Sequence, residues 1–408
     1  MKLDESKKAG WVLGMNTLAF MLCLGCWVMN GVLVTFLVKQ GIYHWNEAQI
    51  GWLIGAPIFT GSVTRLPVGM LTDHCGGRPV FSVLMIFAAG AMWLLAYADS
   101  YLGFLLASFG FGLAGASFAV GVASIPLWFK RERQGSALGI FGFGNIGAGL
   151  TSIGAPILLK YLTAGGASPE AWRMLPKICA LALAAMAILF YVLTPGRKLE
   201  RGREKTFLQR LAPLKHVRVW RFGIYYFLVF GGFVGLSQWL IPYYVNVYAL
   251  PLATAGFLAA CFSLPSGAIR AAGGWISDRW GARSAMYGVL ATILVCFSLL
   301  AGLRPPVAVF TFIVFLAGLA MGIGMAAIYK HIPDYFPDEV GVVGGLVGVF
   351  GGLGGFFLPT LFGYLLQETG LWSTPWILLL ALTAGCLAWM HSVVRRIRRE
   401  ESLNRMTA

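Results

Sequence analysis

Two arginines lie where an apolar chain is least expected to carry a charge. Arg65 and Arg270 each fall inside a long apolar stretch, eight residues before Asp73 and Asp278 respectively. A helix places residues eight apart about 12 Å from each other along its axis. If these stretches cross a membrane, each guanidinium costs at least roughly 2.5–3.5 kcal/mol unless it faces a protein-lined cavity and has a partner.

No acidic residue falls inside an apolar stretch, so the chain itself offers no obvious buried counter-ion. The planar guanidinium fork binds flat oxyanions through two parallel hydrogen bonds. We therefore expect an anionic ligand to be held between Arg65 and Arg270. The alternative is structural: each arginine could extend to the membrane interface or donate to helix carbonyls.

Two glycine-rich stretches form a second feature, GFGNIGAG from Gly142 and GVFGGLGGF from Gly348. Glycines let helices pack closely and let a small ligand approach the backbone. Packing alone accounts for the glycines but not for the lone amide Asn145. Asn30, in the first apolar stretch, is predicted to face the same cavity by polarity. The glycines proposed to line the path are Gly142, Gly144, Gly147, Gly348, Gly351, Gly352 and Gly354.

The elements that would position these residues form an internal repeat. Five identities recur at an offset of 205 residues, Arg65, Gly69, Asp73, Gly76 and Arg78 matching Arg270, Gly274, Asp278, Gly281 and Arg283, and a second set recurs at 207. The repeat predicts two homologous halves. The turns GMLTDHCGGRPV and GGWISDRWGARSAM resemble the loop motif of major facilitator transporters, which implies gating ion pairs for Asp73, Arg78, Asp278 and Arg283. Plain solvated loop charges are the alternative.

Composition requires that these elements lie in lipid. The 408 residues are 58% hydrophobic and 12% charged, and apolar runs of about 20 residues recur along the chain. We predict an all-α polytopic membrane protein with twelve spans in two six-helix halves: residues 1–193, a basic linker at 194–221, and residues 222–408. The predicted spans are 11–38, 50–71, 80–98, 102–128, 136–159, 178–193, 222–247, 253–275, 285–303, 307–329, 342–366 and 376–394.

The basic residues predict the orientation of the chain. With both termini in the cytoplasm, 24 of the 31 lysines and arginines are cytoplasmic, 5 are on the other side and 2 are in spans. The net charge of +15 then indicates contact with anionic lipid, and nucleic acid is not an expected partner. The seven scattered cysteines predict neither disulfides nor a metal site, and no nucleophile and base pair predicts an enzyme. We expect no cofactor, no obligate protein partner, and a monomer in a bacterial inner membrane.

Taken together, the arginines of the second and eighth spans and the glycine-rich stretches of the fifth and eleventh resemble the nitrate/nitrite porter family of the major facilitator superfamily. The resemblance covers the whole chain. It implies alternating access, with nitrate or nitrite clamped between Arg65 and Arg270 and contacted by Asn145. By position it adds three aromatic contacts, Phe118, Tyr226 and Phe230.

For energy coupling we expect nitrate/proton symport, with nitrate/nitrite exchange as the alternative. The compact chain and the stretch IYKHIPDYF resemble the short type of the family, which implies nitrate/proton symport with Lys330 and His331 as titratable candidates. The same two residues could simply cap a helix and contact lipid. A site without a carboxylate also suits nitrate/nitrite exchange. A facilitator for small organic anions such as oxalate or formate is a further alternative.

Overall fold

The computed structural model describes residues 5–197, 211–336 and 340–407, and within these ranges it contains helices and connections but no strand. The side chains of a few residues inside helices, among them Asp278, also lie outside the described set. Part of the basic linker, 198–210, falls in the first gap.

The N-terminal half consists of six spans, several of them built from more than one helical segment. Its elements are α1 Glu5–Trp27, α2 Asn30–Lys39, α3 Glu47–Val63, α4 Arg65–Cys75, α5 Gly77–Leu95, α6 Tyr101–Phe111, η1 Gly112–Ala116, α7 Ser117–Ser124, η2 Ile125–Trp128, α8 Arg131–Gly142, η3 Phe143–Ile146, α9 Gly147–Leu162, η4 Ala164–Gly166, η5 Pro169–Arg173 and α10 Met174–Leu193.

The C-terminal half has longer uninterrupted helices. Its elements are η6 Ala212–Lys215, α12 Val217–Tyr226, η7 Phe227–Gly231, α13 Gly232–Val247, α14 Leu252–Trp280, α15 Ala282–Gly302, α16 Val307–Tyr335, α17 Val340–Thr369 and α18 Thr374–Thr407. The seventh span therefore begins at Val217, five residues before the predicted start, and α14 continues five residues beyond the predicted end, so that Asp278 lies in a helix.

Eleven helical stretches of the described chain are long and apolar enough to cross a membrane. The second predicted span is not among them, and it consists of two shorter helices, α3 and α4, that are separated at Thr64. Counted as one broken helix, α3 and α4 complete the twelve predicted spans. The break falls directly before Arg65.

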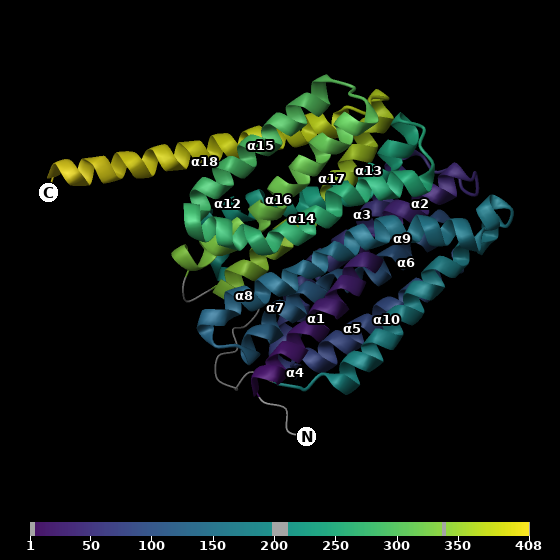
Figure 1. The fold of residues 1–408 in the computed structure, drawn as a ribbon, viewed down its shortest axis with the longest axis horizontal. Helices are drawn as coiled ribbons and strands as arrows, with labels where there is room; N and C mark the ends of the chain where they lie inside the picture. The colour runs from purple at the N-terminus through teal and green to yellow at the C-terminus, as the bar shows by residue number, and fades with distance from the viewer. Residues whose placement is uncertain (1–4, 198–210, 337–339, 408) are drawn as a thin grey trace.

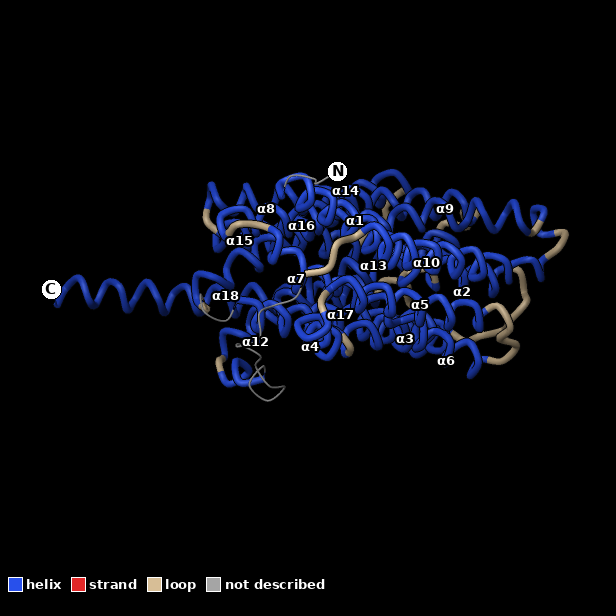
Figure 2. The backbone as a smooth tube through the Cα atoms, turned by 90° about the horizontal axis from the view of Figure 1, so that it is seen from below, coloured by secondary structure: helices blue, strands red, loops and turns tan. Residues whose placement is uncertain are grey.

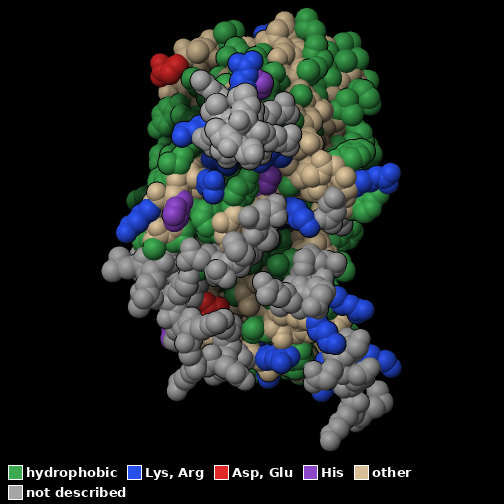
Figure 3. Space-filling view, turned by 90° about the vertical axis from the view of Figure 1, so that its left-hand side faces the viewer, with side chains coloured by type: hydrophobic (Ala, Val, Ile, Leu, Met, Phe, Trp, Pro, Cys, Tyr) green, Lys and Arg blue, Asp and Glu red, His purple; other side chains and the backbone are tan. Residues whose placement is uncertain are grey.

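The two halves lie side by side, the first half purple to blue and the second green to yellow (Figure 1). The same packed bundle is seen edge-on in Figure 2, where α18 projects well beyond the body. The halves meet mainly where α3 packs on α17 and α9 packs on α14. In Figure 1, α1 begins at the lower left of the bundle and α18 ends at the far left, and we call this end of the bundle the termini end. Seen from that side, the face carries many lysines and arginines (Figure 3).

The repeated motif makes the same turn in each half. Gly76 joins α4 to α5 with φ 84°, and Gly281 joins α14 to α15 with φ 80°. Residues other than glycine rarely adopt this left-handed region. The recurrence of glycine at these two positions, 205 residues apart, is therefore explained by one backbone conformation that both halves need.

At the end opposite the termini, which we call the far end, the halves touch directly. The Lys39 ammonium donates to the Leu250 carbonyl at 3.1 Å, and the Trp52 indole donates to the Tyr364 hydroxyl at 3.0 Å. The Ala48 N–H donates to the Gln367 side chain at 3.2 Å. These contacts join the two halves across the far end of the molecule.

Candidate anion site between the halves

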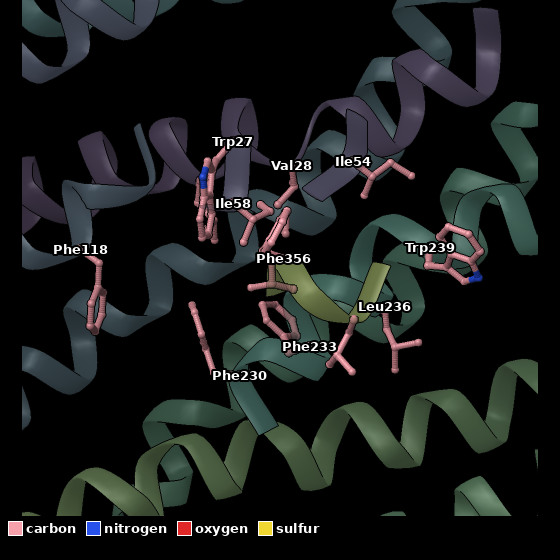
Figure 4. Packing of buried hydrophobic residues seen from close by; sticks show 14 of the residues in the cluster. Trp27, Val28, Ile54, Ile58, Phe118, Phe230, Phe233, Leu236, Trp239 and Phe356 are labelled. Atoms are coloured by element: carbon pink, nitrogen blue, oxygen red, sulfur yellow. The ribbon is translucent and has the colours of Figure 1, made fainter. Parts of the chain in front are cut away.

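Arg65 is 4% exposed and lies among three aromatic rings. Its guanidinium carbon is 5.7 Å from the ring centroid of Trp27, 5.5 Å from that of Phe118 and 5.2 Å from that of Phe230. Figure 4 shows these rings reaching one region from three separate helices. Cation–π attraction of this kind stabilises a desolvated arginine by about 2 kcal/mol or more, so the rings hold the cation without neutralising it.

Arg270 is 8% exposed and has a different set of neighbours. It donates to the Tyr226 hydroxyl at 3.2 Å and lies 4.0 Å from the Met325 sulfur. Its guanidinium carbon is 5.4 Å from the Phe118 ring centroid and 6.0 Å from that of Tyr329.

The two cations share the Phe118 ring and therefore belong to one site. Because both guanidinium carbons lie near that centroid, they are at most about 11 Å apart, and they repel by at least about 1.5 kcal/mol at an effective dielectric of 20. The ion pairs present in the described part of the chain join Arg173 to Asp99 and Glu170, remote from both cations in the sequence. The structure thus brings two buried positive charges together without a described carboxylate to balance them.

Each arginine also reaches the glycine-rich helix of the opposite half. Arg65 donates to the Gly348 carbonyl of α17 at 2.5 Å and, more weakly, to Gly115 at 3.4 Å. A Cβ on Gly142 of α8 would lie 3.2 Å from Nε of Arg270. Two bonds use only two of the five guanidinium N–H donors of Arg65, so donors remain for a further acceptor.

The spans that form this site are irregular at the site itself. Gly115 lies in the 3₁₀ segment η1, Asn145 in the 3₁₀ segment η3, and Phe230 in the π-helical segment η7. Such departures from α-helix geometry often mark functional positions, because they redirect backbone groups and side chains.

Asn145 is fully buried in the contact between η3 and α14. Its amide nitrogen donates to the Gly142 carbonyl at 2.7 Å, while its carbonyl oxygen has no hydrogen-bond partner among the described residues. In this conformation Asn145 holds the backbone of Gly142 beneath Arg270. Its predicted contact with the anion stays a prediction.

Asn30 contacts helices of its own half. Its amide donates to the Leu53 carbonyl at 2.6 Å and to the Ser108 hydroxyl at 2.9 Å, and the residue is fully buried. These bonds tie the start of α2 to α3 and α6. They occupy the donors that an anion would need, so this structure supports a packing role for Asn30.

The predicted glycines divide into two groups. Gly142 and Gly348 border the arginines, as described above. The others mediate helix packing: Gly144 and Gly147 against α1, Gly351 and Gly354 against the seventh span, and Gly352 against Ser62 of α3.

The predicted aromatics Phe118, Tyr226 and Phe230 all border the two arginines. Tyr226 and Phe230 stack in parallel, with ring centroids 5.1 Å apart and planes at 1°. Three neighbours were missed by the sequence interpretation: Trp27, Met325 and Tyr329. The repeat could have indicated Met325, which stands 207 residues after Phe118. Trp27 and Tyr329 carried no sequence signal that separates them from lipid-facing aromatics.

The predicted gating residues lie at the termini end. Arg78 donates to the Tyr191 carbonyl at 2.6 Å and stacks on that ring at 4.3 Å, whereas Arg283 donates to the Tyr335 hydroxyl at 3.1 Å. Asp73 lies near the end of α4. The Asp278 side chain is outside the described residues, so the predicted latch of ion pairs stays a prediction.

Lys330 and His331 lie within α16, at the termini end of the tenth span. Lys330 is exposed. The His331 ring stacks on Phe222, with centroids 5.8 Å apart and planes at 16°, and it borders a pocket that also contains Arg221 and Arg283.

Comparison with known proteins identifies first the class and then the family. Solved transporters share the fold: the bacterial spinster homologue has a TM-score of 0.70 at 17% identity over 95% of this chain and 97% of its own. A nucleoside transporter, NupG, has a TM-score of 0.72 at 14% identity over 94% of this chain and 99% of its own. The Major Facilitator Superfamily model matches residues 15–313 and 250–406.

Proteins of similar sequence identify the family within this superfamily. A probable nitrate/nitrite antiporter, NarK1, of Thermus thermophilus is 42% identical over 96% of this chain and 93% of its own length. A nitrite extrusion protein of Bacillus subtilis is 28% identical over 93% and 94%, and a probable nitrate transporter, NarT, of Staphylococcus epidermidis is 30% identical over 89% and 91%. The chain belongs to the nitrate/nitrite porter family of the major facilitator superfamily, which is a family of transporters and not of enzymes.

Proposed function

We propose that this protein carries nitrate and nitrite across the bacterial plasma membrane by alternating access, with the anion held between Arg65 and Arg270. The observation that supports this most is the pair of buried guanidinium groups beside one ring, Phe118, 5.5 and 5.4 Å from its centroid. The two guanidinium groups repel each other, and this repulsion opposes approach of the halves around an empty site. One monovalent anion between the two groups makes the net interaction attractive.

Binding is coupled to movement through the crossed contacts. Arg65 belongs to the first half but bonds Gly348 of the second, and Arg270 belongs to the second half but lies against Gly142 of the first. An anion that engages both arginines therefore draws the halves together near the site. The far-end contacts of Lys39 and Trp52 must then break for the site to face the other side of the membrane.

Uptake into proteoliposomes tests this function. Labelled nitrate should enter vesicles that contain the protein, nitrite should compete at similar concentrations, and formate or oxalate should compete only weakly. Strong competition by oxalate together with weak competition by nitrite would instead favour an organic-anion facilitator.

For energy coupling we propose nitrate/nitrite exchange. Two guanidinium groups without a described carboxylate beside them suit exchange, because either anion can occupy the site between them. The name of the relative in Thermus thermophilus, a probable nitrate/nitrite antiporter, agrees with this proposal.

Proton symport is the second candidate, favoured by the position of Lys330 and His331 at the termini end of α16. Vesicles preloaded with nitrite or with buffer, with and without a pH gradient, separate the two modes. Exchange predicts uptake that depends on internal nitrite and is insensitive to the gradient. Gradient-driven uptake into nitrite-free vesicles, lost in His331→Gln, would establish symport.

A further inference from the structure

The pocket beside His331 is a second basic site, and it is separate from the central pair of arginines. It lies among α12, α15, α16 and α18, all of the C-terminal half, and has a volume of about 30 Å³. Arg221 and Arg283 supply its cationic side, and the His331 ring is a further polar group of the lining. Met390, Val393 and Val394 of α18, with Met286 and Ile328, supply an apolar side.

A buried hydroxyl in this pocket lacks a partner. Tyr225 is 4% exposed, lines the pocket, and its hydroxyl makes no hydrogen bond to any described residue. A buried hydroxyl without a partner costs about 1–3 kcal/mol. The cost is offset if the hydroxyl donates to a ligand that enters the pocket.

The charges around Tyr225 indicate the kind of ligand. The Arg221 guanidinium carbon is 5.6 Å from the Phe222 ring centroid, and Arg221 makes no ion pair within the described part of the chain. Arg283 donates one N–H to the Tyr335 hydroxyl. Both guanidinium groups keep donors for an oxyanion. The group that satisfies two arginines and a hydroxyl donor is a phosphate or a similar oxyanion.

The position of the pocket favours a phosphate attached to a lipid. It lies near the ends of α12, α15 and α16 at the termini end, a face that carries many lysines and arginines (Figure 3). Its apolar side, formed largely by α18, suits the glycerol and first methylenes of a lipid. Basic pockets between membrane helices of this kind bind anionic headgroups.

We propose that Arg221, Tyr225 and Arg283 form a binding site for a phosphate group, supplied by an anionic phospholipid of the surrounding leaflet. Through α12 the site is adjacent to the anion path, because Tyr225 faces the pocket while the next residue, Tyr226, bonds Arg270. Occupancy therefore stabilises the position of Tyr226 at the central site.

Native mass spectrometry of the detergent-solubilised full chain tests this site without reference to transport. With added phosphatidylglycerol, the wild type should retain lipid at low concentration, whereas Arg221→Gln and Tyr225→Phe should each weaken retention about tenfold, as loss of a charge-assisted or buried hydrogen bond predicts. Arg279→Gln is the matched control, since Arg279 is exposed at the same end and stacks on Trp275 outside the pocket.

Competition distinguishes the source of the phosphate. If millimolar inorganic phosphate leaves the lipid bound, and phosphatidylcholine does not replace phosphatidylglycerol, the anionic lipid is the ligand. If inorganic phosphate binds and displaces the lipid with the same dependence on Arg221 and Tyr225, the site stands but its ligand is a free oxyanion. Retention of phosphatidylglycerol by Arg221→Gln and Tyr225→Phe at the level of the wild type would overturn the proposal.

Discussion

At the scale of single residues, the proposed anion site consists of two guanidinium groups that contact aromatic rings and, among the described residues, no carboxylate. Trp27, Phe118 and Phe230 surround Arg65, and Tyr226 bonds Arg270. This arrangement keeps both cations buried and leaves them able to accept an anion. Both the shape and the charge of the guanidinium should therefore matter.

Arg65→Lys tests whether the planar shape of the guanidinium matters. Lysine keeps the charge but loses the planar fork that binds a flat oxyanion through two hydrogen bonds. We expect nitrate uptake to fall at least about tenfold while the protein remains folded, corresponding to loss of one charge-assisted bond. Arg279→Lys, at an exposed position, should transport like the wild type. Near-normal uptake by Arg65→Lys would show that charge alone suffices.

Gly142→Ala tests the close approach of Arg270 to the other half. The added Cβ would lie 3.2 Å from Nε and 3.3 Å from Cδ of Arg270, so the side chain must shift. We expect the KM for nitrate to rise roughly tenfold, equal to about 1.4 kcal/mol. Gly139→Ala on the same helix, where a Cβ meets nothing within 4 Å, is the control. Equal KM values for both variants would argue against this contact.

At the scale of elements, the spans around the site are interrupted where they contribute to it. Helix breaks or altered turns occur at Thr64, in η1, in η3 and in η7, beside Arg65, Gly115, Asn145 and Phe230 respectively. The π-helical segment η7 packs on α17 through glycines on both sides.

Gly354→Ala tests that contact. Its Cβ would lie 2.5 Å from the Phe227 carbonyl and 3.0 Å from Cα of Gly231, both backbone atoms that cannot move aside easily. Overpacking of this kind costs about 1–3 kcal/mol, so we expect a lower Tm in detergent. Gly345→Ala, on the same helix with nothing within 4 Å, should leave Tm unchanged. Equal Tm values for Gly354→Ala and Gly345→Ala would contradict this prediction.

Much of this architecture was predictable from the sequence, because apolar length predicts spans and repeated residues predict repeated turns. Gly76 and Gly281 illustrate this, since matched glycines in the sequence have matched positive φ values of 84° and 80° in the structure. The irregular turns were not predictable. Whether a glycine-rich run forms an α, 3₁₀ or π turn depends on neighbouring helices, and those contacts are set by the tertiary fold.

The charged residues of the candidate site could be predicted from the sequence, whereas residues whose position depends only on packing could not. Arg65 and Arg270 stood out because a buried cation is costly. Asn30 was predicted to face the cavity by polarity, but its donors bond Leu53 and Ser108. Tyr329 was missed because aromatic residues are common in spans and only the fold shows that it lies 6.0 Å from Arg270.

At the scale of the whole molecule, the proposed alternating access requires the far-end contacts between the halves to break. Trp52 bonds Tyr364 across that interface at 3.0 Å. A short bifunctional thiol reagent that links Trp52→Cys to Tyr364→Cys should abolish nitrate uptake, and reductive cleavage of the link should restore it. Each single variant controls for the native cysteines, of which Cys75 is exposed. Full uptake in the crosslinked protein would contradict alternating access through this end.

The most direct test of the central claim is equilibrium binding of nitrate to the solubilised full chain, measured by isothermal titration calorimetry. We predict saturable binding by the wild type and loss of detectable binding in both Arg65→Gln and Arg270→Gln, with unfolding temperatures close to that of the wild type. If either glutamine variant binds nitrate with the Kd of the wild type, the anion does not lie between the two arginines.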